Sequence, residues 1–573
     1  MTYREEYARW LNAPLTPDEH AELASIHDDR EIRERFYAPL TFGTAGLRGI
    51  LGMGINRMNT YTVCQVTQGL ATLIVGLGKE AMARGVAVCY DCRHKSPEFA
   101  RAVAEVLTGN GIRVLLFDAM RPTPELSFAI RYYQCIAGVN ITASHNPKEY
   151  NGYKVYWEDG AQLPPAEADI VSCAIAKVDL FTGVTRMAFD DAVAQGLIVF
   201  LGHETDEAFL SCCLSQSVAR DAVEKAADTL KIVYTPFHGT GYKLVPEILS
   251  RIGLKHLLCD PVQSIPDADF PTVKSPNPQD AEGFAGSIKL ARENDADLIL
   301  GTDPDADRIG IVVRDRKGEY KTVTGNQTGC LLLDFLIRAK KERGTLPENA
   351  AVVKTIVTTE MARTIAEKNG VYCADTFTGF KFLAEQIRKF EETGSHRFIL
   401  AFEESYGYLV GDGARDKDAV TAAMLITEMA AWYHLRGMTL CDALEDLYAR
   451  YGYYIDETVN LVFPGADGLQ TMKNLMDNLR AETPRTLAGT EVLRLRDYLT
   501  GTAKTLSGGT EEAIEPQGSN VLGFDMADGT RIIVRPSGTE PKIRVYILLH
   551  GTDRDECAQR VKRYAEVARG FGK

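Results

Sequence analysis

The chain has 573 residues, of which 45% are hydrophobic and 25% charged, and its formal net charge is −14. This length is too great for one hydrophobic core and predicts several domains. The acidic balance argues against nucleic acid or an anionic membrane as a partner, because both attract basic surfaces.

The cysteines and the N-terminal segment indicate a cytoplasmic protein. Twelve cysteines are spread without a disulfide-like pattern, and no apolar run reaches the length that crosses a membrane. Residues 1–37 are charged and helix-like, without the apolar segment of a signal peptide. Cys89 and Cys92 precede His94, but no second pair stands at zinc spacing, so we interpret this motif as incidental.

Short apolar runs alternate with amphipathic stretches along the chain, which is typical of α/β layers. A strand, a helix closed by Gly111 and a second strand are predicted at 86–90, 96–110 and 112–117. Strands that end in polar loops are expected at 136–141, 230–234, 296–300, 351–354 and 397–401.

Later segments differ in character from these units. Residues 200–225 read as helical, and 314–318 read as a hairpin or a link. The last part of the chain is predicted to be α+β, with strands at 531–534 and 543–549 and a helix at 553–569.

The most informative loop follows the strand predicted at 296–300. It carries Asp303, Asp305 and Asp307 at alternate positions. Like charges this close repel one another unless a cation lies among them, and carboxylate oxygens suit a hard divalent cation such as Mg²⁺. Arg308 follows directly and would face an anion held by the metal, for which phosphate fits best.

Two simpler interpretations of this acidic loop were weighed. A solvated turn explains many acidic runs, but this one ends a buried-looking strand, where ligand loops of α/β sheets lie. An EF-hand loop requires Gly at its sixth position and Glu at its twelfth, where Arg308 and Arg314 stand.

Ser144 follows the strand predicted at 136–141 and can serve as a nucleophile or as a covalent phosphate carrier. His145, Lys148 and Lys154 crowd the same loop, and cations suit a phosphoserine and a proton-transfer step. The structural alternative is a serine that caps a helix. No G-x-S-x-G sequence surrounds Ser144, which argues against an α/β-hydrolase.

Two further loops carry polar groups. Residues 535–541 combine a fixed cation, hydroxyl groups and a glycine-bearing turn, which is typical of a phosphate-binding nest. Glu403, Glu404 and Ser405 end an apolar strand, where paired carboxylates do acid–base work, hold sugar hydroxyls or form a surface turn. No P-loop motif is present, so ATP is unsupported as a phosphoryl donor.

Four motifs resemble those of the α-D-phosphohexomutases, in the family's order and over nearly the whole chain. They are T-A-S-H-N-P at 142–147, D-P-D-A-D-R at 303–308, E-E-S at 403–405 and R-P-S-G-T-E-P at 535–541. The opening G-T-A-G-L-R-G at 43–49 resembles the branch that holds bacterial long-chain phosphoglucomutases and animal phosphopentomutases.

This resemblance implies an α/β fold with the four-domain phosphohexomutase architecture, in which three similar α/β domains and a C-terminal α+β domain surround a central cleft. The expected domains, each with one of the four loops, are 1–205 with the phosphoserine, 206–318 with the metal, 319–452 with the sugar and 453–573 with the phosphate.

The resemblance also implies residue roles. Ser144 would carry the phosphoryl group and contact one Mg²⁺ per chain, which Asp303, Asp305 and Asp307 would hold. Arg48, Lys154 and Arg308 would surround the phosphoryl group, and the sequence does not decide between Lys154 and His145 as general base. The substrate contacts implied are Thr44, Arg48, Lys354, Thr378, Gly379, Glu403, Ser405, Arg535, Ser537, Gly538 and Thr539.

The implied reaction interconverts glucose 1-phosphate and glucose 6-phosphate, with glucose 1,6-bisphosphate as intermediate and activator. Alternatives are a phosphopentomutase acting on ribose or deoxyribose phosphates, a phosphomannomutase and a sugar-bisphosphate synthase, and the chain can be a monomer or a homodimer. Phe402 and Phe380 depart from the family pattern near the expected hexose.

Two interpretations from other classes are weaker. A phosphatase with Asp303 as nucleophile usually carries Thr or Val where Asp307 stands. A non-enzymatic metal-binding protein does not explain Ser144 and its cationic neighbours.

Overall fold

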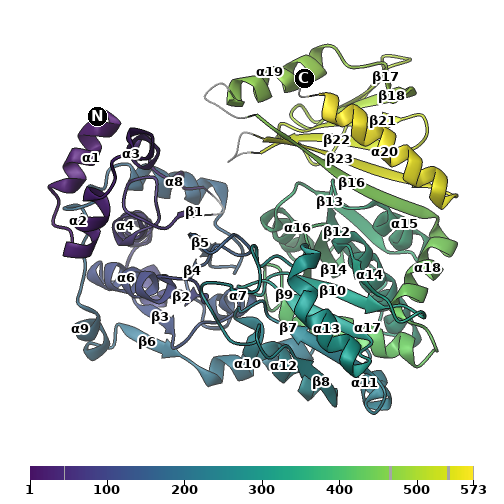
Figure 1. Cartoon of the computed structure of the whole chain (residues 1–573), viewed down its shortest axis with the longest axis horizontal. Helices are drawn as coiled ribbons and strands as arrows, with labels where there is room; N and C mark the ends of the chain where they lie inside the picture. Colours follow the sequence, from purple (N-terminus) through teal and green to yellow (C-terminus); the bar gives the residue numbers. More distant parts are fainter. Residues whose placement is uncertain (44–45, 464–467, 538–541, 572–573) are drawn as a thin grey trace. The chain divides into compact units, whose positions relative to one another are not determined.

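The computed structural model describes residues 1–43, 46–463, 468–537 and 542–571. Contacts divide the chain into two units. In Figure 1 the colours follow the sequence, from purple at the N-terminus to yellow at the C-terminus. Unit 1 comprises residues 1–325 and 405–439, and unit 2 comprises 326–404 and 440–573. Within the described ranges, no helix is both long and apolar enough to cross a membrane.

The first sheet of unit 1 has six strands in the order β1-β5-β4-β2-β3-β6. They are β1 (Leu47–Ile50), β2 (Val86–Tyr90), β3 (Val114–Phe117), β4 (Ala137–Ile141), β5 (Tyr150–Trp157) and β6 (Ile198–Leu201). β2 is parallel to β3 and β4, so the loops that follow β2 and β4 emerge at the same sheet edge. The strands predicted at 86–90, 112–117 and 136–141 are confirmed.

Helices cover this sheet, and others form the N-terminal segment that precedes it in the chain. They are α1 (Tyr3–Leu11), α2 (Pro17–Ala24), α3 (Asp29–Phe36), α4 (Thr60–Leu77), α5 (Lys79–Arg84), α6 (Ser96–Gly109), α7 (Thr123–Tyr132), α8 (Pro165–Ile175) and α9 (Phe189–Ala194). Thr2, Thr16 and Asp28 cap α1, α2 and α3 through their side-chain oxygens. The predicted helices in 1–37 and at 96–110 are confirmed.

The second sheet of unit 1 has the strand order β11-β10-β9-β7-β8. The strands are β7 (Lys231–Thr235), β8 (His256–Cys259), β9 (Leu298–Thr302), β10 (Ile309–Arg314) and β11 (Tyr320–Val323). The acidic loop joins β9 to β10, which pair antiparallel, and β10 and β11 form the hairpin predicted at 314–318. The loop therefore lies at the end of a fully buried strand, as predicted.

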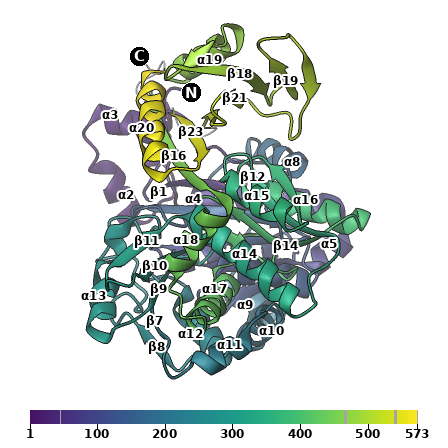
Figure 2. The same cartoon turned by 90° about the vertical axis from the view of Figure 1, so that its right-hand side faces the viewer.

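The remaining helices of unit 1 are α10 (His203–Leu214), α11 (Arg220–Ala226), α12 (Gly241–Arg251), the 3₁₀ helix η1 (Ala281–Phe284), α13 (Ala285–Asn294) and α17 (Ala419–His434), and a short strand, β15 (Gly407–Leu409), precedes α17. Figure 2 shows α17 beside α11 and α12, against which it packs. The prediction that all of 200–225 is helical is wrong at its start, because Phe200 and Leu201 pair with β3 and close β6.

Three features cross the predicted domain borders. The border at 205 falls within α10, and β11 completes the second sheet beyond the border at 318. Residues 405–439 belong to unit 1 because nearly the whole of α17 is buried. The border at 452 coincides with Gly452, whose φ of 93° turns the chain from α18 into β16.

Unit 2 begins with parallel strands in the order β13-β12-β14. Its first elements are α14 (Gly325–Glu342), β12 (Ala350–Thr355), α15 (Glu360–Lys368), β13 (Tyr372–Thr376), α16 (Phe380–Thr393), β14 (Arg397–Glu403) and α18 (Leu440–Tyr451). β12 and β14 confirm the strands predicted at 351–354 and 397–401.

The C-terminal part of unit 2 is an antiparallel sheet in the order β16-β23-β22-β21-β18-β19-β20. It comprises β16 (Tyr453–Val462), β17 (Thr486–Leu487), β18 (Thr490–Asp497), β19 (Thr502–Thr505), β20 (Glu511–Ala513), β21 (Leu522–Met526), β22 (Arg531–Pro536) and β23 (Lys542–Gly551). Of its two helices, α19 (Gly468–Ala481) and α20 (Arg554–Gly570), the second lies along β16 and β23 (Figure 1). The predicted α+β character is confirmed.

Candidate active site

Ser144 lies just beyond β4 in a backbone conformation that side chains seldom adopt. Its φ is 52°, and it is only 2% exposed. Such strain persists where the surroundings enforce it, commonly at functional sites. Its Oγ donates to Asp303 Oδ2 at 2.8 Å and lies 3.2 Å from His145 Nδ1. The loops that contain Ser144 and Asp303 were predicted separately from the sequence, and in the structure they meet at the Ser144 hydroxyl.

Arg93 holds the Ser144 loop (residues 142–147), and sequence reasoning missed it. Its side chain is fully buried, with Nη2 donating to Ser144 O at 2.6 Å and Nη1 to Pro147 O at 2.8 Å. Asp91 Oδ2 lies 3.2 Å from Arg93 Nε and balances its charge. The available signal was an Asp-x-Arg sequence directly after a buried strand.

The metal loop (residues 303–308) uses some of its carboxylate oxygens within the protein. Asp303 Oδ1 accepts the backbone N–H groups of Asp307 and Arg308 at 3.1 and 3.0 Å. Asp305 Oδ2 accepts from Lys154 Nζ at 2.6 Å, and the same ammonium lies 3.2 Å from Asp307 Oδ2. In contrast, Asp305 Oδ1 and Asp307 Oδ1 are buried and accept no hydrogen bond.

These residues fit a divalent cation. All three carboxylates are buried, and each offers an oxygen within 4.8 Å of the others. Burial, followed by the charges of Asp305 and Asp307, raises the pKa of Asp303 well above its usual value. Buried carboxylate oxygens without partners cost free energy, and a hard cation with oxygen ligands removes that cost.

The electrostatic surroundings distinguish Lys154 from His145, the two candidate general bases. Burial alone lowers the pKa of Lys154, but Asp305 and Asp307 outweigh it and the net shift is upward, so this ammonium keeps its proton. Burial and the neighbouring Arg308 and Arg48 lower the pKa of His145 well below its usual value. His145 is therefore neutral near pH 7, and the same shift makes its imidazole a weaker base than a free histidine.

The two predicted arginines lie beside these loops. Arg48 is on the edge strand β1, and its Nη1 donates to Asn146 Oδ1 at 2.7 Å. Arg308 Nε lies 3.7 Å from Asp307 Oδ1. Thr44, the other residue predicted near the opening motif, lies outside the described residues.

Two segments outside the four motifs support the metal loop. Thr240 donates its backbone N–H to Pro304 O at 2.8 Å, and a Cβ on Gly239 would lie only 2.3 Å from Pro304 Cα. Gly239 thus allows the turn after β7 to approach the loop. Lys417 approaches from the other segment, with its Nζ 3.2 Å from Asp307 Oδ2. Neither was predicted.

In unit 2, Glu403 of the sugar loop and the turn before α16 come together. Glu403 is 5% exposed, and its Oε1 accepts the N–H of Gly379 at 2.6 Å. Gly379 has a φ of 120°, which disfavours a side chain there. The neighbouring Thr378 Oγ1 is buried without a hydrogen-bond partner. Ser405, which follows the strand β14, belongs to unit 1 and is half-buried in a turn.

The predicted phosphate loop is only partly described. Arg535 lies near the end of β22, and its Nη1 donates to Tyr546 OH at 3.3 Å. Ser537 donates its backbone N–H to Lys542 O at 2.8 Å. Gly538 and Thr539 lie outside the described residues.

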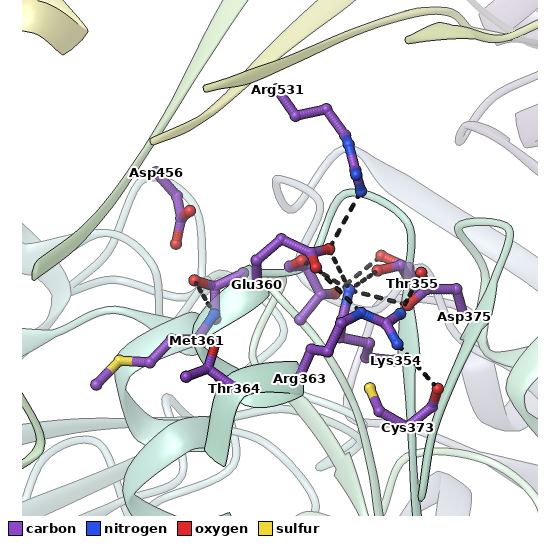
Figure 3. A network of polar contacts seen from close by, with 12 residues as sticks. Lys354, Thr355, Glu360, Met361, Arg363, Thr364, Cys373, Asp375, Asp456 and Arg531 are labelled. Atoms are coloured by element: carbon purple, nitrogen blue, oxygen red, sulfur yellow. Dashed lines mark hydrogen bonds and ion pairs between the residues drawn. The ribbon is translucent and has the colours of Figure 1, made fainter. Parts of the chain in front are cut away.

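Lys354, predicted as a substrate contact, lies in the interior of unit 2. Its side chain is fully buried, and its Nζ lies 3.0 Å from Glu360 Oε1 and 2.9 Å from Asp375 Oδ1. Figure 3 shows the ammonium in the middle of these carboxylates, with Arg363 and Arg531 beside them. Lys354 is thus an interior ion-pair residue in this structure.

Phe402 and Phe380, the two departures from the family pattern, are buried in this structure. Their exposed fractions are 0% and 2%, so both are core residues. A Cβ on Gly329 of α14 would lie 2.2 Å from the Phe402 ring, which shows that the ring occupies the space of the missing side chain. Their departure from the family pattern is accommodated by packing.

Family models for all four domains match the chain. They are described as phosphoglucomutase/phosphomannomutase, alpha/beta/alpha domains I, II and III at residues 39–180, 208–318 and 324–451, and C-terminal domain at 489–567. The chain belongs to the phosphoglucomutase/phosphomannomutase family, and the four-domain prediction is confirmed. It is an isomerase of the intramolecular phosphotransferase kind, which acts on phosphorylated sugars.

Individual relatives refine this class. A protein of Staphylococcus haemolyticus named phosphoglucomutase is 36% identical over 545 residues, covering 95% of this chain and 96% of the relative. One of Staphylococcus epidermidis with the same name is 39% identical over 535 residues, covering 93% and 94%. The structure of parafusin, a phosphoglucomutase from Paramecium, matches the fold with a TM-score of 0.69 at 19% identity, covering 94% of this chain and 97% of that one.

Proposed function

We propose that this chain is a phosphoglucomutase that interconverts glucose 1-phosphate and glucose 6-phosphate through a phosphorylated Ser144. The 2.8 Å bond between Ser144 Oγ and Asp303 Oδ2 carries the proposal, because it joins a nucleophilic hydroxyl to the candidate metal ligands. Full-length relatives with 36–39% identity carry that enzyme name, which favours glucose over pentose or mannose phosphates.

In the proposed reaction, the free hydroxyl of the sugar monophosphate attacks the phosphorus of phosphoserine, its proton passes to His145, the bond between phosphorus and Ser144 Oγ breaks, and Oγ takes up the proton from His145, which leaves glucose 1,6-bisphosphate and a free serine. After the bisphosphate reorients, Ser144 Oγ attacks its other phosphorus. The serine O–H bond breaks, its proton passes to His145 Nδ1, and the bond between phosphorus and the sugar oxygen breaks as that oxygen takes up a proton. The enzyme ends as it began.

Charged side chains neutralise the transferring group in this scheme. Lys154, Arg48 and Arg308 lie around the two loops, and phosphoryl transfer depends chiefly on positioning and charge stabilisation. When bound, one Mg²⁺ per chain, held by Asp303, Asp305, Asp307 and Ser144 Oγ, supplies further charge stabilisation there.

The remaining contacts are proposed on the family pattern. Glu403 and Ser405 would hold sugar hydroxyls, and the Thr378–Gly379 turn would complete that surface, since Glu403 already binds its backbone. The phosphate that does not react would be bound by Arg535 and Ser537 with Gly538 and Thr539. Glucose 1,6-bisphosphate would also prime the serine as activator.

The substrate assignment is tested by kcat/KM on glucose 1-phosphate, mannose 1-phosphate and ribose 1-phosphate, with Mg²⁺ and a trace of glucose 1,6-bisphosphate. We expect glucose 1-phosphate to lead clearly. A lead for ribose 1-phosphate would move the assignment to a phosphopentomutase and leave the fold and chemistry intact.

Ser144→Ala tests the covalent carrier. Turnover should vanish, because the change removes the hydroxyl beside Asp303 that would carry the phosphoryl group. Ser287→Ala is a matched control, since Ser287 Oγ also donates to a buried aspartate, Asp260, at 2.9 Å away from the metal loop. Turnover in the Ser144 variant comparable to that of the control would refute the phosphoserine.

A further inference from the structure

A third segment outside the four motifs, the first turn of α7, also contacts the metal loop. Thr123 begins this helix and is 0% exposed. Its backbone N–H donates to Asp305 O at 2.8 Å, and its Oγ1 donates to Asp305 Oδ2, also at 2.8 Å. One buried residue therefore holds both the backbone and the side chain of Asp305.

The backbone contact follows from the place of Thr123 in its helix. The first N–H groups of a helix have no acceptor within the helix and need a partner from elsewhere. Pro122, which precedes Thr123 at the N-cap, has no side-chain oxygen to accept them. The N–H of Thr123 finds its acceptor in the metal loop, and this bond ties the start of α7 to Asp305.

The direction of the side-chain contact is set by its surroundings. A carboxylate oxygen only accepts hydrogen bonds, so the single hydroxyl proton of Thr123 points at Asp305. Thr123 Oγ1 in turn accepts from Asn140 Nδ2 at 2.7 Å, and Asn140 is fully buried on β4. Asn140 stands directly opposite Lys154 in the pairing of β4 with β5, so both side chains lie on the same face of the sheet. That face presents the ammonium of Lys154 beside the amide that orients Thr123.

This arrangement gives the two oxygens of Asp305 different surroundings. Oδ2 accepts from Lys154 Nζ at 2.6 Å and from Thr123 Oγ1, whereas Oδ1 is buried and accepts no hydrogen bond. The Lys154 ammonium is shared, because it also lies 3.2 Å from Asp307 Oδ2. The one hydroxyl proton of Thr123 goes to Asp305, and rotation of the carboxylate would break that bond. Thr123 therefore fixes which oxygen of Asp305 is left without a partner.

We propose that Thr123 is a positioning residue for the metal loop, which holds Asp305 through its N–H and its hydroxyl so that Asp305 Oδ1 remains available to a divalent cation. The inference rests on the proposed metal-dependent function and adds to it a residue from the start of α7. Groups that orient a metal ligand typically contribute about 10- to 100-fold to metal affinity, and Thr123 stands in that position.

Thr123→Val tests the hydroxyl directly, because valine has nearly the same shape as threonine and keeps the backbone N–H. Mn²⁺ binding to the full chain, followed by electron paramagnetic resonance without sugar, should weaken by about 10- to 100-fold. The Mg²⁺ concentration that gives half-maximal turnover should rise by a similar factor. At saturating Mg²⁺ the KM for glucose 1-phosphate should change by less than about twofold, since Thr123 acts through Asp305.

Thr123→Ser and Ser287→Ala are the matched controls. Serine keeps the hydroxyl and loses only a buried methyl group, so thermal stability should fall while Mn²⁺ affinity stays close to that of the unaltered protein. Ser287→Ala removes a buried hydroxyl that donates to Asp260 Oδ2 at 2.9 Å, away from the metal loop, and should also leave Mn²⁺ affinity unchanged. A drop in Mn²⁺ affinity in either control equal to that of Thr123→Val would overturn the specific role of the hydroxyl.

Thr123→Ala provides a second route if Thr123→Val fails to fold, because it removes the hydroxyl without placing a methyl group against Asp305. Mn²⁺ affinity should fall in the same direction. Unchanged or tighter Mn²⁺ binding in these variants would overturn the proposal, since a hydroxyl that merely competes with the cation for Asp305 predicts tighter binding on its removal. Failure of the unaltered protein to bind Mn²⁺ would refute the metal site itself and this proposal with it. The substrate preference is measured separately, so a wrong sugar assignment is distinguishable from a wrong role for Thr123.

Discussion

The metal loop of unit 1 and the Lys354 network of unit 2 are built from the same residue types, but they leave different atoms unpaired. The Lys354 network comprises Lys354, Glu360, Arg363, Asp375 and Arg531. In it, both oxygens of Glu360 and both oxygens of Asp375 have a cationic partner within 3.1 Å. In the metal loop, Asp305 Oδ1 and Asp307 Oδ1 have no cationic partner this close: neither accepts a hydrogen bond, and Arg308 Nε lies 3.7 Å from Asp307 Oδ1.

The pKa values of the carboxylates in the two clusters follow this difference in pairing. Burial raises the pKa of Glu360, but Lys354, Arg531 and Arg363 outweigh it and bring the value to about 2. Burial and two neighbouring aspartates raise the pKa of Asp303 well above its usual value. Buried carboxylates that are all paired with cationic side chains stabilise the fold. Buried carboxylates with too few cationic partners favour the binding of a metal cation. Counting partners for each oxygen therefore separates a structural cluster from a functional one.

Asp303→Asn should give the largest effect on activity. Metal-assisted charge stabilisation is worth several kcal/mol, so kcat/KM should fall by about a thousandfold or more. The same change should raise the melting temperature of the metal-free protein, since it removes a charge that burial and like charges oppose. Asp375→Asn is the contrasting variant and should lower the melting temperature. Equal shifts in both variants would remove the distinction drawn between the two clusters.

Lys354→Met should act on stability. Removing one member of a buried ion-pair network typically costs about 3–5 kcal/mol, because the carboxylates that remain are left uncompensated. Denaturant unfolding measures that loss. At a temperature where the variant is folded, KM for glucose 1-phosphate should stay near that of the unaltered protein. A large rise in KM with little loss of stability would restore the substrate contact that the sequence predicted.

Asp456→Asn tests a smaller effect in unit 2, at a cavity of about 390 Å³ that Asp456 lines with Tyr454, Arg531 and His550. Burial raises the pKa of Asp456 from 3.8 to about 7. Because the folded state binds this proton more tightly than the unfolded state, stability should decline as the pH rises from about 4 to about 7. Asn cannot ionise, so the variant should lose that decline.

Thermal unfolding across this pH range measures the effect. We expect Asp456→Asn to be more stable than the unaltered protein at pH 8 by up to about 4 kcal/mol, and close to it at pH 4. Parallel stability curves for the two proteins would show that Asp456 does not titrate as its buried oxygen suggests.

Local patterns made much of this molecule predictable. The strand before Asp303 and the loop that follows it are adjacent in the sequence, so the spacing of the aspartates was enough to predict a metal site. The alternation of apolar runs also located most strands, including β2 and β12, within two residues. The length and burial of these strands leave few other arrangements.

Contacts between distant segments were not predictable in this way. Lys417 reaches Asp307 only because Gly407 leaves room for its stem, and such a long-range fit has no sequence spacing. A signal was present in residues 415–418, where four charged residues stand beside the apolar helix α17. The ion pairs of Lys354 were not predictable for a related reason, since the carboxylates that enclose it come from α15 and β13.

The most direct test of the account is to locate the phosphoryl group. The purified chain would be incubated with glucose 1,6-bisphosphate and Mg²⁺, digested and examined by mass spectrometry before and after addition of glucose 1-phosphate without bisphosphate. The account predicts one phosphate on Ser144 that passes to the added sugar. A phosphate on another residue, or one on Ser144 that the sugar cannot remove, would contradict it.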